Sequence, residues 1–105
     1  MEKRLWYMAH PYSDNPERNF DLANERASRL VKKGFHLYSP ISHTHPIHMV
    51  AGMPWEFWMD FDESFMKICD GIILCPGWEN SKGCNIERKF FQDHGKDVLL
   101  YEEII

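Results

Sequence analysis

The feature that most constrains the fold of this chain is an alternation of short apolar runs with longer segments of helical periodicity. The apolar runs have the length of strands and lie at residues 4–9, 35–39, 71–75 and 97–101. The helical patterns lie at residues 16–34, 54–69 and 81–95. Strands that alternate with helices predict a parallel sheet with right-handed crossovers and helices on both faces. We therefore expect a three-layer α/β fold with four or five parallel strands.

Local signals place the element boundaries. Asn15 is suited to cap the first helix and Pro16 to occupy its first turn. Ser81 can cap the last helix. The stretch from Ile41 to about Gly52 carries three histidines and is expected to be irregular. A chain of 105 residues can build one hydrophobic core, so we expect one domain over residues 1–105, similar to a small flavodoxin or Rossmann unit.

Composition narrows the classes of function. Twelve Lys and Arg against sixteen Asp and Glu give a net charge of −4, which argues against a nucleic-acid binder. No apolar run reaches the roughly 18–20 residues that cross a bilayer, and the amino terminus lacks a signal-peptide core. The three cysteines form no C-x-x-C pair, so neither a disulfide framework nor a four-thiolate zinc site is expected. We expect a cytoplasmic protein that binds neither nucleic acid nor membrane.

Parallel sheets of this type bind ligands outside the carboxyl ends of their strands, so the loops after the strands are expected to form the site. His10 directly follows the first strand and is a candidate site residue. At the start of the last helix, Ser81 and free backbone N–H groups can hold an anion such as phosphate. Gly83 would let that backbone approach the anion closely. A plain N-cap explains the same segment equally well.

Two carboxylates are placed where carboxylates are unusual. Glu87 lies between Phe90 and Phe91 on a helical wheel, so we expect it to point inward, where an unpaired carboxylate is costly. Its position near the helix start predicts an ionised side chain, which suits a nucleophile; a side chain turned to solvent is the alternative. Asp62 is expected to reach the same cleft. Two carboxylates about 5 Å apart can cleave a glycosidic bond with retention.

With these residues in place, the chain resembles the nucleoside 2-deoxyribosyltransferase superfamily, including its 2'-deoxynucleoside 5'-phosphate N-hydrolase branch, and looks closest to a short bacterial and phage branch. In that family a Tyr on the first strand contacts the catalytic Glu, and Tyr7 matches it. The family also has an active-site Asp eight residues before the Asp that opens the third strand. Asp62 and Asp70 have the same spacing. The phosphohydrolase motif Ser-x-Gly-x-x-x-Glu is matched by Ser81, Gly83 and Glu87.

The resemblance implies an N-glycoside hydrolase or a deoxyribosyltransferase that acts on a nucleoside or nucleoside 5'-monophosphate. Glu87 would attack the anomeric carbon, Asp62 would orient or protonate the base, and Tyr7 would position Glu87. Ser81 and Gly83 would hold the 5' end of the sugar. No cofactor and no metal are implied, the ligand would be a small molecule, and the superfamily implies a homo-oligomer of two or more subunits.

The sequence departs from the family pattern in two places. Asn85 and Ile86 replace the Gly and aromatic residue that often precede the Glu, which predicts a different pocket shape near the sugar. Phosphohydrolases of the family take a further phosphate contact from a partner subunit, through a stretch beyond the final strand. The sequence ends at Ile105, and we expect this contact to be missing.

The segment between the second strand and the second helix offers further candidates. His43, His45 and His48 lie close together and allow three interpretations: a metal site, a contact with base or phosphate, or a loop that orders the cleft. No carboxylate nearby completes a metal site, and we select His45 as a candidate substrate contact. Trp58 is a candidate to stack on a base, with a place in the core or at a subunit contact as the alternative.

Two other classes of function stay open at this point. One is a nucleotide-binding or sensor module without turnover. The other is a metal-dependent hydrolase built on the histidines. The chain has neither the P-loop pattern nor Gly-x-Gly-x-x-Gly, which argues against ATPases and dinucleotide enzymes.

Overall fold

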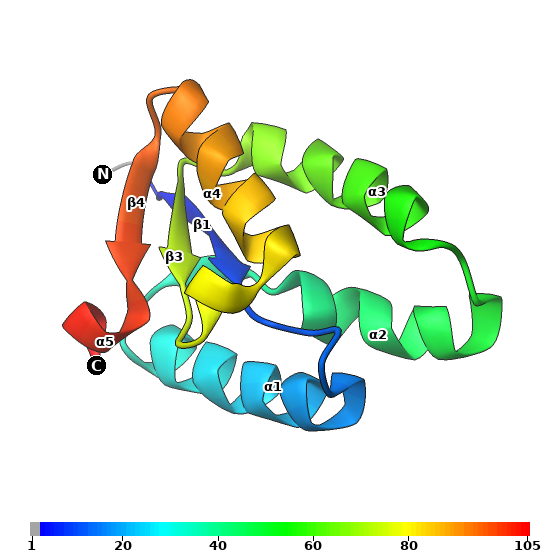
Figure 1. The fold of residues 1–105 in the computed structure, drawn as a ribbon. Coiled ribbons are helices and arrows are strands. Elements are labelled where there is room, and N and C mark those ends of the chain that lie inside the picture. The colour runs from blue at the N-terminus through cyan, green and yellow to red at the C-terminus, as the bar shows by residue number, and fades with distance from the viewer. Residues whose placement is uncertain (1–2) are drawn as a thin grey trace.

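A computed structural model describes residues 3–105 of the chain and has an α/β fold (Figure 1). Four parallel strands form one sheet in the order β2-β1-β3-β4. The strands are β1 (Leu5–Ala9), β2 (His36–Tyr38), β3 (Gly71–Leu74) and β4 (Asp97–Leu100). The helices are α1 (Pro16–Lys32), α2 (Pro40–Ala51), α3 (Trp55–Ile68), α4 (Lys82–Asp93) and the short α5 (Tyr101–Ile104), with a 3₁₀ turn η1 (Trp78–Asn80). The expected three-layer architecture is confirmed, with four strands.

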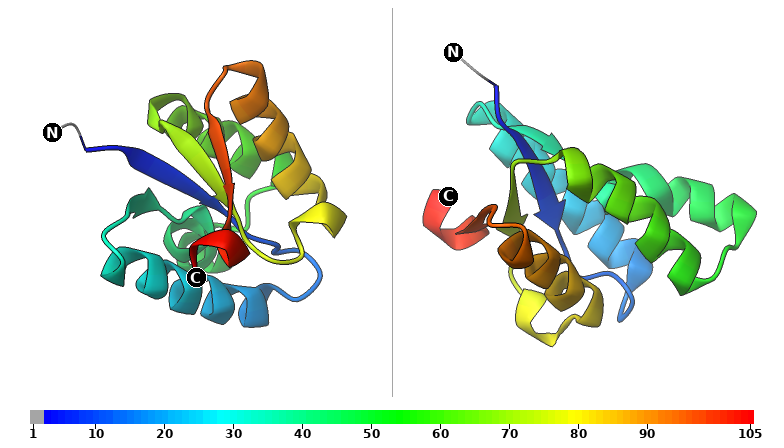
Figure 2. Two further views of the ribbon diagram at one scale, coloured as in Figure 1. Left: turned by 90° about the vertical axis from the view of Figure 1, so that its left-hand side faces the viewer. Right: turned by 90° about the horizontal axis from the view of Figure 1, so that it is seen from above.

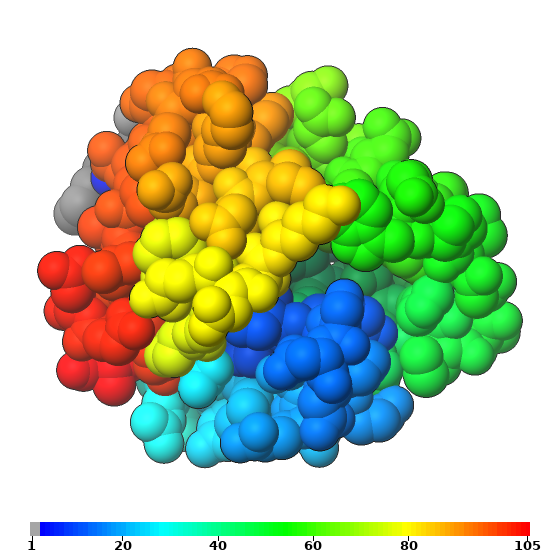
Figure 3. All heavy atoms as spheres, viewed as in Figure 1, coloured from blue at the N-terminus to red at the C-terminus, as the bar shows by residue number. Residues whose placement is uncertain are grey.

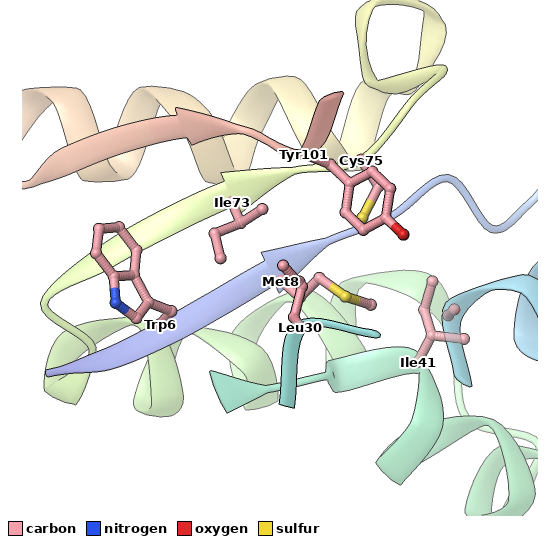
Figure 4. Packing of buried hydrophobic residues seen from close by; sticks show 8 residues of the cluster. Trp6, Met8, Leu30, Ile41, Ile73, Cys75 and Tyr101 are labelled. Atoms are coloured by element: carbon pink, nitrogen blue, oxygen red, sulfur yellow. The ribbon is translucent and has the colours of Figure 1, made fainter. Parts of the chain in front are cut away.

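Helices cover both faces of the sheet (Figure 2). On one face, α1 and the start of α2 pack on alternate residues of β1 and β3, among them Met8 and Ile73 (Figure 4). On the other face, α3 and α4 pack on Tyr7, Ile72 and their neighbours. β1 and β3 are buried on both sides, which explains why their sequences are continuous apolar runs.

Gly71 shows how closely the strand starts are packed. A Cβ at this position would lie 2.4 Å from the Trp6 ring and 2.9 Å from the Asp97 carbonyl oxygen. Trp6 and Asp97 belong to the strands on either side of β3. A side chain at residue 71 would therefore displace one of them.

The predicted irregular stretch between Ile41 and Gly52 is wrong, because it forms helix α2. Pro40 occupies the first helical position, where a missing N–H is not needed. Pro46 lies inside the helix and leaves the carbonyl of residue 42 without its usual donor. The helix ends at Gly52, whose φ of +59° is the left-handed conformation that favours glycine. Packing of α2 against α1 and the sheet outweighs these weak local signals.

The predicted strand over residues 97–101 is one residue too long. β4 ends at Leu100, and Tyr101 begins the short helix α5. The Tyr101 ring turns back over the carboxyl end of the sheet and is buried beside Cys75 (Figure 4). The predicted cap of α1 is confirmed, since the backbone N–H of Arg18 donates to Asn15 Oδ1 at 3.3 Å.

Lys96 ties the end of α3 to the turn between α4 and β4. Its ammonium group donates to the carbonyl oxygens of Met66, Lys67 and Cys69, at 3.1, 2.9 and 2.6 Å. These carbonyls lie at the end of α3, where helical partners are lacking. Lys96 therefore fixes the end of the helix that carries Asp62.

None of the helices within residues 3–105 has the length and apolar character needed to cross a bilayer.

Candidate active site

A cavity of about 1050 Å³ lies at the carboxyl ends of the strands, as expected for this fold. It is bounded by the loops after β1 and β3 and by the facing sides of α1, α2, α3 and α4. In Figure 3 it appears as a hollow between the loop after β1 (blue), the start of α4 (yellow) and the α2–α3 pair (green). Its volume is at the upper end of the range for small-ligand pockets, which is about 300–1,000 Å³.

Glu87 lies in this cavity wall and is 6 % exposed. Its carboxyl oxygen Oε2 accepts a hydrogen bond from the Tyr7 hydroxyl. Tyr7 is on β1, and its ring is completely buried between Tyr38 and Phe91. The rigid strand therefore positions one oxygen of Glu87, while the side chain still reaches the cavity.

Asp62, from α3, lines the same cavity and is 8 % exposed. Its Oδ1 atom is buried without a hydrogen-bond partner within residues 3–105. Glu87 and Asp62 thus reach one cavity from two helices, and they are close enough for the Asp62 charge to raise the pKa of Glu87. Asp70, just before β3, accepts a hydrogen bond at 2.7 Å from the backbone N–H of Leu5.

Both carboxyl groups favour their neutral forms. Burial raises the pKa of Glu87 from 4.5 to about 8, with the nearby Asp62 charge adding to the rise and the Tyr7 hydrogen bond opposing it. Burial raises the pKa of Asp62 from 3.8 to about 7. The expectation that the helix dipole keeps Glu87 ionised is therefore contradicted, because the pKa of Glu87 is raised and not lowered. Glu87 follows the first turn of α4, beyond the reach of most of the dipole effect, and desolvation dominates.

The start of α4 forms one end of the cavity wall. Ser81 Oγ accepts the backbone N–H of Cys84 at 3.2 Å, so Ser81 is the N-cap. Ser81, Lys82 and Gly83 all line the cavity. A Cβ placed on Gly83 would have no heavy atom within 4 Å, so the backbone there faces open space. The Lys82 ammonium lies 5.0 Å from the centre of the Trp55 ring, which places α4 and α3 at one mouth of the cavity.

Aromatic and sulfur-containing side chains from α3 and the preceding loop form another part of the wall. Met53, Trp55 and Trp58 line the cavity. The Trp58 indole N–H donates to His48 Nδ1 at 2.9 Å, which links α3 to α2. Trp58 is half-buried, so its ring combines a structural contact with a surface toward the cavity.

The three histidines of α2 point to different partners. His45 is buried and does not line the cavity; its Nδ1 lies 2.6 Å from the Tyr12 hydroxyl and its Nε2 lies 3.0 Å from Glu17 Oε1. His43 Nδ1 lies 2.9 Å from the Tyr38 hydroxyl. His48, rather than the predicted His45, reaches the cavity. Residues 3–105 hold no group of three potential ligands that could bind a metal.

His10 lines the cavity as predicted, and Arg26 of α1 lies beside it. The two are joined by a 2.7 Å contact between Arg26 Nη1 and His10 Nε2, and His10 Nδ1 lies 2.8 Å from the Pro11 carbonyl oxygen. Burial lowers the pKa of His10 from 6.5, and the Arg26 charge lowers it further. Sequence reasoning missed Arg26. The available signal was its place on the same face of α1 as Asn19 and Leu22, which also line the cavity.

A search of the curated proteins finds no match to this chain. The family model described as a domain of unknown function (DUF1937) matches residues 4–103. The resemblance to the nucleoside 2-deoxyribosyltransferase superfamily stays a prediction, because neither comparison names that superfamily. The match extends over all the strands and over both helices that supply the buried carboxyl groups. The chain therefore belongs to the DUF1937 family.

Proposed function

We propose that this protein cleaves the N-glycosidic bond of a nucleoside or a nucleoside 5'-monophosphate. The observation that carries the proposal is the pair of buried carboxyl groups, Glu87 and Asp62, which line one cavity from different helices. A carboxyl pair of this kind supplies both the nucleophile and the proton that a glycosidic bond needs for cleavage. The hydrogen bond from the Tyr7 hydroxyl to Glu87 makes the two carboxyl groups chemically different.

Glu87 is the nucleophile of the proposed reaction. The hydrogen bond from Tyr7 favours the charged form of a carboxylate, and it falls on Glu87, whereas Asp62 Oδ1 has no such donor within the described residues. Tyr7 engages Oε2, which leaves Oε1 to attack the anomeric carbon. The bond from this carbon to the base breaks as the new carbon–oxygen bond forms, and its electron pair moves to the base nitrogen.

Asp62 supplies the proton in this scheme. Its pKa, raised to about 7, leaves the carboxyl group about half protonated at pH 7. The reactive form of the pair is the one in which a single proton is on Asp62 and Glu87 is charged, so that Asp62 can donate to the departing base. The resulting carboxylate then takes a proton from water, whose oxygen attacks the anomeric carbon and releases Glu87. If a second base replaces water, the same steps transfer the sugar. The two outcomes correspond to a hydrolase and a transferase.

The remaining lining residues fit the other parts of such a substrate. The wall of Met53, Trp55 and Trp58 offers a flat apolar surface for a base. Ser81, Gly83 and the first N–H groups of α4 suit the 5' end of the sugar or its phosphate. His10, in the loop after β1, also lines the cavity.

The test is base release, followed by liquid chromatography, from a panel of ribo- and deoxyribonucleosides and their 5'-monophosphates. We expect turnover by the wild type, and a loss of about 10³-fold or more in kcat for Glu87→Gln, as for removal of a covalent nucleophile. Asp62→Asn should lose activity most strongly with poor leaving groups. Asp60→Asn is the matched control, because Asp60 is exposed on the same helix and does not line the cavity. Equal turnover by the wild type and Glu87→Gln would falsify the mechanism.

One observation favours a second candidate, a nucleotide-binding module without turnover. The pKa of Glu87, raised to about 8, leaves this group mostly protonated at neutral pH, and a protonated carboxyl group is a poor nucleophile. Calorimetric binding of a nucleotide with no base released after prolonged incubation at pH 8–9 would support this module over the enzyme.

A further inference from the structure

The cavity contains a second polar centre on the side of α1, formed by Arg26 and His10. The Pro11 carbonyl oxygen only accepts hydrogen bonds and the Arg26 guanidinium only donates them. His10, placed between them, is therefore a neutral ring that donates from Nδ1 and accepts at Nε2. It orients the guanidinium but does not balance its charge.

The charge of Arg26 has no counterion among the residues that the structure describes. Within residues 3–105 Arg26 makes no salt bridge, and His10 is its hydrogen-bonded side-chain partner. The Tyr101 ring centre lies 5.9 Å from the guanidinium carbon. Arg26 is half-buried, and a guanidinium has five N–H donors in a planar fork that matches phosphate. Most of these donors are thus available to an anion in the cavity.

The charge balance of the cavity wall also favours an anionic ligand. Its cations are Arg18, Arg26 and Lys82. Of its three acidic groups, Asp62 and Glu87 have raised pKa values, so that at pH 7 Glu87 is mostly and Asp62 about half protonated. Asp14 is exposed at the rim and accepts a hydrogen bond from Asn19 at 2.8 Å. The wall is therefore positive, although the chain as a whole has a net charge of −4.

The Arg26 centre is separate from the carboxyl pair. Tyr7, which holds Glu87, faces α3 and α4, whereas the next residue of β1, Met8, faces α1. His10 continues on the α1 side and contacts Arg26. Three residues along a strand correspond to about 10 Å. The cavity thus joins two polar centres from opposite faces of the sheet, with the loop after β3 (Pro76 and Gly77) also in its wall.

We propose that Arg26, held by His10, binds a second phosphate, so that the cavity prefers a nucleoside 5'-diphosphate to the corresponding monophosphate. The start of α4 takes the first phosphate and Arg26 takes the one beyond it. This inference rests on the proposed function for the nucleotide character of the ligand, but it does not require turnover.

The test measures binding to the Glu87→Gln protein by isothermal titration calorimetry, without divalent metal and at fixed ionic strength. The probes are matched 5'-mono- and 5'-diphosphates of deoxyadenosine, deoxyguanosine, deoxycytidine and thymidine. We expect at least one diphosphate to bind about 10-fold or more tightly than its monophosphate, as for one charge-assisted contact. Arg26→Met should abolish this advantage. Arg29→Met is the matched control, because Arg29 is on the same helix, contacts Glu25 and lies outside the cavity wall.

Equal affinities of mono- and diphosphates for the parent protein would overturn the inference. So would a loss in Arg26→Met that is the same for both, since Arg26 would then contact the first phosphate. If the melting curve shows that Arg26→Met does not fold, Arg26→Lys keeps the cation without the planar fork and should reduce the advantage; an unchanged advantage would contradict the proposal. Because no product is measured, a failure of the proposed glycosidase reaction leaves this result interpretable.

Discussion

Glu87→Gln should make the protein more stable at alkaline pH. The pKa of Glu87 in the folded protein is about 8, against an ordinary value of 4.5. Between these values the folded protein binds more protons than the unfolded chain, so its free energy of unfolding falls as the pH rises. Below about pH 4.5 both states are protonated and the effect vanishes. Glutamine has no proton to lose in this range, so this decrease in the free energy of unfolding is absent from the variant.

The size of the effect follows from the same values. One pKa unit corresponds to about 1.4 kcal/mol, so the whole shift corresponds to about 5 kcal/mol above pH 8. The variant also weakens the hydrogen bond from Tyr7, which costs about 1–2 kcal/mol. We therefore expect a net gain of about 3–4 kcal/mol at pH 9. With a urea dependence of about 2 kcal/mol per molar, the middle of the usual range, the unfolding midpoint should rise by about 1.5–2 M.

The assay is urea unfolding, followed by tryptophan fluorescence, at several pH values from 4.5 to 9 and at constant ionic strength. The difference in unfolding free energy between variant and wild type should grow with pH and level off above about 8. Titrating groups that do not interact with Glu87 are common to both proteins and cancel. Asp60→Asn, at an exposed position of α3, should show no such growth. A difference that stays constant over this range would refute the reasoning, because Glu87 would then titrate normally.

Three further predictions concern the pair and its support. With an uncharged nucleoside, kcat/KM should rise with pH up to about 7 and fall above about 8. The reason is that the reaction needs one proton shared between Asp62 and Glu87. An acidic limb of the pH profile near pH 4 would contradict this. Tyr7→Phe should lower kcat about 10–100-fold with little change in KM. It should also move the acidic limb of the pH profile to higher pH, because the Glu87 carboxylate loses the hydrogen bond from Tyr7. An acidic limb at unchanged pH would show that Tyr7 has a merely structural role. Lys96→Met should lower the free energy of unfolding by about 1–3 kcal/mol, because three carbonyl oxygens lose their donor, whereas the exposed Lys89→Met should change it by less than about 0.5 kcal/mol; equal losses in the two variants would count against this.

The layers of the fold could be predicted because their signals are local. β1 and β3 are continuous apolar runs, and α1 has both a capping Asn15 and a proline in its first turn. Helix α2 could not be predicted in this way. It has two prolines and no charged side chain, and its buried residues, such as Ile41 and His45, are too few to form a periodic pattern. Its helical state depends on packing with distant segments.

The sequence predicted which residues form the site better than it predicted their protonation states. The helical wheel indicates that Glu87 points inward, and the structure places it in the cavity wall together with Asp62. Its ionisation depends on burial and on Tyr7, which is 80 residues away in sequence. The same applies to Arg26, since its contact with His10 forms only when α1 packs beside the loop after β1.

The division of the cavity wall among separate segments has a consequence for redesign. The carboxyl groups and Tyr7 lie on α3, α4 and β1, whereas Met53 and Trp55 lie at the connection after Gly52. Met53 precedes α3 and Trp55 begins it, so side-chain changes at these two residues at unchanged length leave the sheet that holds Tyr7 unaltered. Libraries at Met53 and Trp55, with Gly52 kept for its left-handed conformation, are therefore the natural place to select for new bases in the proposed reaction.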